Sequence, residues 1–113
     1  MDSVNKTLYI PLRGKAYVSN LGILLSDPEA EAIWEAQKFP LKGKAATKWL
    51  AYSMGIRAAV FDRWLLENLT PDAVVLHLGC GLDSRVLRTG PRENLWFDVD
   101  FPEVIAERKR YFS

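Results

Sequence analysis

The pattern of hydrophobic and polar positions divides the chain into two parts of different character. Residues 1–70 carry apolar residues at steps of three and four after a short leader, and this spacing predicts helices. Residues 73–113 instead follow the order strand, turn, short helix, strand, helix. Residues 69–72 form a turn signal between the two parts and are too few for an interdomain linker. We therefore expect a single domain, with a helical lead-in over 1–70 and a βαβα unit over 73–113.

Two helices are predicted within the lead-in. The first begins at residues 26–29, where Asp27 can cap free amides and Pro28 suits the first helical position. Ser26 with Glu29 also fits a capping box. It ends near residues 39–40. The second runs from about 45 to 69, and its large apolar residues recur on one stripe: Trp49, Tyr52, Ile56, Val60, Phe61, Trp64, Leu65 and Leu69.

Glycine and proline positions qualify this helical pattern. Pro11 and Gly14 are expected to break any earlier helix in the leader. Gly55 marks either a bend in the long helix or a point of close packing. The four tryptophans are expected in the core.

The second part begins with an almost continuous apolar segment, residues 73–78, which suits a strand buried on both faces of a parallel sheet. A second strand is predicted at residues 94–99. Residues 100–103 form a good helix cap, and the helix that follows ends with three basic residues at 108–110, where cations complement the helix dipole.

Composition and charge narrow the class of protein. The chain is 49% hydrophobic and 26% charged, which excludes disorder and a fibrous repeat. Fifteen Lys and Arg face fourteen Asp and Glu, so no basic excess indicates nucleic acid. Cys80 and His77 are single, so a disulfide within the chain and a cysteine-rich zinc site are excluded, and we expect no metal. No secretory signal or membrane-length apolar run is visible, which favours a cytoplasmic protein.

The candidate chemistry lies at the turn after the first strand. Gly79 and Gly81 lack a Cβ atom, so the backbone can turn sharply and a ligand can approach it. Asp100 follows Gly79 by 21 residues, close to the offset of about 20 expected for a ribose-binding acid in a Rossmann-like unit. Asp98 is a rival for that role. His77 is expected to be a packed strand residue.

The ligand indicated by this turn is not a typical dinucleotide. Ser84 stands where the dinucleotide fingerprint requires a third glycine, which lowers the case for NAD or FAD. A ligand without phosphate, such as S-adenosylmethionine, fits the turn better. Asp83 would then lie near the sulfonium, where a phosphate would be repelled, or it simply caps the next helix. A dinucleotide-binding oxidoreductase fragment remains an alternative.

The stretch VVLHLGCGLDSRVLR, followed by LWFDVDFPEVIAERKRYF, resembles the leucine carboxyl methyltransferase family, and within it the O-methyltransferases of polyketide synthesis. The segments ILLSDPEAEAIWE and GIRAAVFDRWL resemble the helical lead-in of that family. The resemblance implies an α/β, Rossmann-like S-adenosylmethionine-dependent methyltransferase fold, of which this chain is the N-terminal part. It also implies O-methyl transfer to a carboxylate or hydroxyl of a small molecule.

The resemblance also implies cofactor-binding residues. Asp100 matches a ribose-binding acid, and Arg57 matches a basic residue that pairs with the cofactor carboxylate. Lys15 is similar to a lead-in lysine that reaches the cofactor, with Arg13 two residues away as the other choice. Three more residues complete the candidate set around Gly79: Cys80, Gly81 and Asp83. None of these is a candidate general base, so the catalytic residues stay unknown.

Length is the main departure from the family, whose members are much longer. The chain is therefore expected to be a fragment, a truncated gene product, or a half that a second copy completes. Two parallel strands alone leave their edges unpaired, which predicts self-association through the exposed sheet edge. A non-catalytic interaction module is thus the second alternative.

Overall fold

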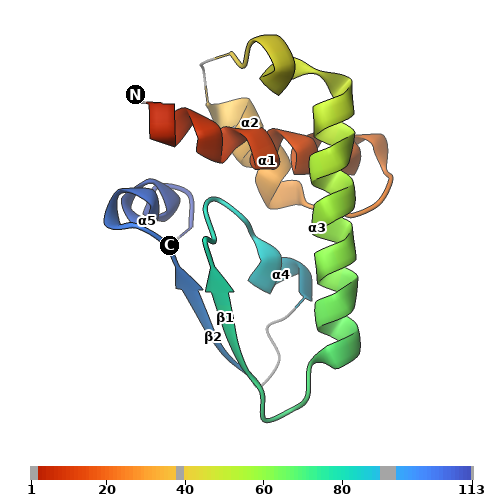
Figure 1. The fold of residues 1–113 in the computed structure, drawn as a ribbon, viewed down its shortest axis with the longest axis vertical. Coiled ribbons are helices and arrows are strands. Elements are labelled where there is room, and N and C mark those ends of the chain that lie inside the picture. Colours follow the sequence, from red (N-terminus) through yellow and green to blue (C-terminus); the bar gives the residue numbers. More distant parts are fainter. Residues whose placement is uncertain (1–2, 38–39, 90–93, 113) are drawn as a thin grey trace.

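A computed structural model describes residues 3–37, 40–89 and 94–112. The elements follow in the order α1 (Ser3–Leu21), α2 (Pro28–Ala36), the 3₁₀ helix η1 (Gly43–Ala46), α3 (Lys48–Asn68), β1 (Val74–Leu78), α4 (Arg85–Thr89), β2 (Leu95–Val99) and α5 (Pro102–Lys109). Strands β1 and β2 form a two-stranded sheet. Figure 1 shows helices α1, α2 and α3 together on one side and the sheet on the other, with α4 between the sheet and α3. Among the described residues, no helix is both long and apolar enough to cross a bilayer.

The two strands pair in parallel, as predicted. Val74 lies opposite Leu95, and the register continues to Leu78 opposite Val99. The prediction that the first strand is buried on both faces is wrong. Only the face that carries His77 is covered, while Leu76 on the other face is 60% exposed.

Helix α2 confirms the predicted start. The Asp27 side chain accepts a hydrogen bond from the Ala30 amide at 3.1 Å, and Pro28 is the first helical residue. The N-cap is therefore Asp27, one residue later than the capping-box pattern required. The helix ends at Ala36, before the predicted boundary, of which Phe39 lies outside the described residues.

Helix α1 contradicts the prediction that Pro11 and Gly14 break the leader. Both lie inside one continuous helix. A proline in a helix interior costs about 3 kcal/mol. Tyr9 and Leu12 are almost fully buried, and each such side chain contributes roughly 1.5–3 kcal/mol, so tertiary burial outweighs the local cost.

Helix α3 buries a different face from the predicted one. Its buried positions are Ala51, Gly55, Ala58 and Asp62, whereas Trp49 is 75% exposed. A Cβ atom at Gly55 would lie only 2.7 Å from both methyl groups of Val18, so this glycine marks close packing against α1 and not a bend. The predicted stripe of large apolar residues is mostly exposed, and Trp49 and Trp64 do not lie in the core.

The core joins the lead-in helices to the glycine turn. Tyr9, Leu12 and Ala16 of α1 pack against α2 and against Leu82, which follows the turn. The hydroxyl groups of Tyr9 and Tyr111 lie 2.9 Å apart, so the end of the chain is also tied to α1. The first strand and its turn are thus fixed against helices from far earlier in the sequence.

Candidate functional site

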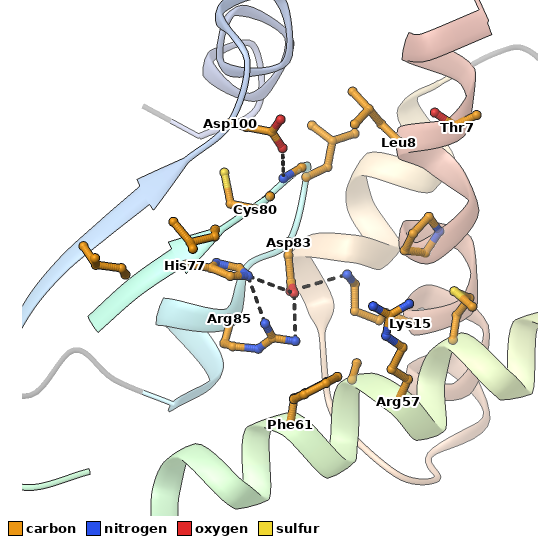
Figure 2. A pocket seen from close by; sticks show the side chains of 18 residues that line it. Thr7, Leu8, Lys15, Arg57, Phe61, His77, Cys80, Asp83, Arg85 and Asp100 are labelled. Carbon is orange, nitrogen blue, oxygen red and sulfur yellow. Dashed lines mark hydrogen bonds and ion pairs between the residues drawn. The ribbon is translucent and has the colours of Figure 1, made fainter. Parts of the chain in front are cut away.

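A cavity of about 470 Å³ lies where the lead-in helices meet the carboxyl ends of the two strands. Figure 2 shows side chains from α1, α3, the turn after β1 and the end of β2 around it. All of the cofactor-binding residues predicted from the sequence line this cavity: Lys15, Arg57, Gly79, Cys80, Gly81, Asp83 and Asp100. Residues separated by up to 85 positions are therefore brought to one site.

The turn after β1 depends on its glycines. Gly79 and Gly81 have φ angles of 64° and 52°, in the left-handed region that other residues rarely adopt. A Cβ atom at Gly79 would meet no atom within 4 Å, so the backbone there lies open to the cavity. Cys80 between them is buried, and burial raises the pKa of its thiol above the ordinary value.

Asp100 is the acid that reaches this turn. Its Oδ2 atom accepts a hydrogen bond from the Gly81 amide at 2.9 Å, and its Oδ1 atom accepts one from the Phe101 amide. The N-cap of α5 is Phe101, without a side-chain cap, so Asp100 does not cap that helix in the predicted manner. Asp98, the rival acid, points to the covered face of the sheet and does not line the cavity.

Two cations reach the cavity from α1 and α3. Lys15 is buried and lies 3.4 Å from the Asp83 carboxylate, and its burial lowers its pKa despite that partner. Arg57 is exposed and stacks 5.9 Å from the Phe61 ring centre. Within the described part of the chain, Arg57 makes no ion pair, so its guanidinium is available to an anion. Arg13 instead donates to the Thr47 carbonyl and does not line this cavity.

Asp83 is held by more cations than the sequence suggested. Lys15, Arg85 and Arg88 all lie within 3.4 Å of its carboxylate. Burial by itself would raise the pKa of Asp83, but these three cations outweigh it and hold the pKa well below its usual range. Figure 2 shows Asp83 between Lys15, Arg85 and His77.

Arg88 links the turn to two of the lead-in helices, α2 and α3. It makes a two-pronged ion pair with Asp62 of α3 and a further pair at 2.8 Å with Asp27, the N-cap of α2. Arg85 also pairs with Asp62, at 2.9 Å. This network was not predicted from the sequence. Arg85 and Arg88 are three apart on a short helix, which is a local sign of a shared face, but nothing local indicated Asp62 as their partner.

His77 is buried in β1, as predicted for a packed strand residue, but its two charged partners were not predicted. Arg85 Nη1 donates to His77 Nε2 at 2.9 Å, so the imidazole proton lies on Nδ1, which donates to Asp98 at 3.0 Å. His77 lines the cavity, and burial lowers its pKa. Across residues 3–37, 40–89 and 94–112, no group of three or more His, Cys, Asp or Glu is arranged to hold a metal ion.

A cavity at the carboxyl ends of parallel strands, bordered by a glycine turn and an acid, is where open α/β proteins bind nucleotide-like ligands. The fold is therefore α/β, and the cavity at the strand ends is a candidate ligand site. Comparison with known proteins identifies the family within this class. The family model for leucine carboxyl methyltransferase matches residues 12–112, so the chain belongs to the leucine carboxyl methyltransferase family.

A curated relative supports the same family. The chain is 35% identical to the tetracenomycin polyketide synthesis O-methyltransferase TcmP of Streptomyces glaucescens, over 117 aligned positions that include 99% of this chain. The chain spans 43% of the length of that relative. No solved structure matches the chain significantly.

Proposed function

We propose that this chain forms the S-adenosylmethionine site of a methyltransferase that acts on an oxygen, a carboxylate or hydroxyl, of a small molecule. The observation that carries the proposal is the meeting of Gly79, Asp100, Arg57 and Lys15 around one cavity. Family membership and the O-methyltransferase relative support it. The proposal includes a Rossmann-like fold and a cytoplasmic location, with no nucleic acid or membrane partner.

The residues present fit this cofactor. Arg57 would hold its carboxylate, since a guanidinium fork matches a carboxylate well. Asp100 already accepts two backbone hydrogen bonds, but a carboxylate offers about four acceptor positions, so it can still bind ribose hydroxyls. The open backbone at Gly79 leaves room for close approach. Lys15 and Asp83, paired with one another, would form the wall beside the amino-acid end.

When bound, S-adenosylmethionine supplies the methyl group. The contribution of this chain would be to bind and orient the cofactor and to exclude water, because transfer to an ionised acceptor requires mainly alignment of the reacting atoms. We assign no general base.

Calorimetric titration with S-adenosylhomocysteine tests the proposal. We expect micromolar binding by the native chain and at least about tenfold weaker binding after Asp100→Ala, because the ribose hydroxyls lose their acceptor. Asp72→Ala, at an exposed acid in the turn before β1, is the matched control and should bind like the native chain. Absence of binding by the native chain would refute the proposal for this chain.

The dinucleotide alternative is disfavoured by Ser84, and NADH is therefore the control ligand in the titration. Ser84 is 2% exposed and donates a hydrogen bond to Asp27 at 2.7 Å, so it belongs to the network behind the turn. Binding of NADH without binding of S-adenosylhomocysteine would favour the dinucleotide alternative.

A second candidate function is a non-catalytic module that associates with itself. It is favoured by an uncovered apolar face of the sheet, which carries Val74, Leu76, Leu78, Leu95, Phe97 and Val99. The sequence predicted self-association through the sheet edge, and the proposal adds this exposed face as a second contact surface. Self-association without cofactor binding would support it.

A further inference from the structure

Arg108 on α5 differs from its basic neighbours. The sequence indicated three cations that complement the end of a helix, and Lys109 and Arg110 are indeed exposed. Arg108 is only 8% exposed, and its side chain runs back to the turn after β1. Its guanidinium lies 4.6 Å from the Phe112 ring centre, which covers one side of it.

The guanidinium contacts the turn directly. Nη1 donates to the carbonyl of Gly81 at 3.0 Å and to the carbonyl of Asp83 at 2.7 Å. Nη2 donates to Asp98 Oδ2 at 2.8 Å, which fixes the orientation of the fork. Asp98 is itself held by His77 and Trp96 on the covered face of the sheet.

These contacts determine the backbone orientation of the turn. A peptide group is planar and trans, so a fixed carbonyl also fixes the next amide in the opposite direction. Arg108 therefore orients the amide after Gly81 and the amide after Asp83. On the other side of the turn, the Gly81 amide is held by Asp100. The turn is thus held by Asp100, which follows β2, and by Arg108 of α5.

We propose that Arg108 is a positioning residue that holds the cofactor-binding turn in its binding conformation. Two glycines with positive φ make this turn costly to order, and a turn that is already ordered has less freedom to lose when a ligand binds. The guanidinium fork reaches the two carbonyls through Nη1 and the Asp98 carboxylate through Nη2, whereas an ammonium offers all of its donors from a single nitrogen. The inference rests on the proposed function.

The experiment compares Arg108→Lys with Lys109→Gln, a control at the next, exposed position of the same helix. Amide hydrogen exchange is measured on the chain without ligand. The amides of Gly81 and Asp83 are hydrogen-bonded in the ordered turn, to Asp100 and to the Cys80 carbonyl, so they report its opening. We expect them to exchange at least about tenfold faster in Arg108→Lys, while amides of β1, which report global opening, change less than about twofold. S-adenosylhomocysteine affinity is expected to fall about tenfold in this variant. The control should change neither quantity.

Each outcome decides the inference. Native exchange rates and native affinity in Arg108→Lys would overturn it. Equal acceleration of turn and strand amides would also overturn it, since the role would then be general stability. If the native chain binds no S-adenosylhomocysteine, the proposed function fails, whereas the exchange of the turn amides still decides whether Arg108 holds the turn.

Discussion

At the scale of single residues, the site is defined by which polar groups have partners and which do not. Asp83 and Arg88 are surrounded by opposite charges, whereas Arg57 faces the cavity without an ion pair among the described residues. His77 is locked as a neutral tautomer between Arg85 and Asp98. A buried group of this kind makes stability depend on pH.

We predict that the free energy of unfolding falls as the pH falls below about 6.5. Burial is the largest effect on His77, and together with Arg85 it lowers the pKa below 6.5 despite Asp83 and Asp98. Between the folded and unfolded pKa values, the unfolded chain binds more protons, so acid favours unfolding, by at most about 1.4 kcal/mol per pH unit. Urea denaturation at a series of pH values below about 6.5 measures the free energy of unfolding of the native chain and of His77→Gln.

The variant lacks a titrating group at position 77 and should lose this slope. Asp83 does not interfere, because its depressed pKa removes stability only below its ordinary value of 3.8. Identical pH profiles for the native chain and His77→Gln would contradict the assignment.

At the scale of helices and strands, the contact between α1 and α3 fixes the lead-in. Both helices place a glycine at the contact, and α3 presents small residues where larger ones would hold the helices apart. This close approach carries Lys15 and Arg57 to the same cavity. The geometry of the site therefore depends on residues that do not line it.

We predict that Gly14→Ala destabilises the chain. The added Cβ would lie 2.4 Å from the Met54 Cβ and 2.8 Å from the Ala51 carbonyl oxygen, so the helices would have to move apart. Overpacking of this kind costs roughly 1–3 kcal/mol, which exceeds the gain of at most about 1 kcal/mol from alanine in a helix. Urea denaturation measures the difference. Arg63→Ala, at an exposed position of α3, should stay within about 0.5 kcal/mol, and a Gly14→Ala variant more stable than the native chain would refute the packing argument.

At the scale of the whole molecule, one face of the sheet has no cover among the described residues. Leu76 and Phe97 are opposite one another in register, and both are at least half exposed. Contiguous apolar surface of this kind marks an interaction site or favours association. In a solution of the purified chain, a second copy offers the same surface.

We predict concentration-dependent self-association, measured by sedimentation velocity. Phe97→Lys should reduce it, because the charge would have to be buried in the contact between two sheet faces. Trp49→Lys is the matched control, because it also removes an exposed aromatic, near the start of α3. Figure 1 shows that this end of α3 lies away from the sheet. A monomeric native chain, or an equal effect of both variants, would contradict this contact.

Several features of the molecule could be predicted from the sequence alone, because their causes are local. The Asp27 cap, the parallel strands and the glycine turn each depend on neighbouring residue types and short spacings. The offset between Gly79 and Asp100 was also informative, because two adjacent parallel strands bring the ends of both to one edge. Features of the site that depend on short segments could therefore be predicted from the sequence.

Only the tertiary structure decided which groups meet across the molecule. The face that α3 buries follows from its contact with α1, which reverses the expectation from its large apolar residues. The continuity of α1 through Pro11 follows from the burial of its neighbours. Arg108 has the sequence signature of a helix end, yet it holds the turn. Burial and partnership depend on what packs from distant segments, and no local pattern contains that information.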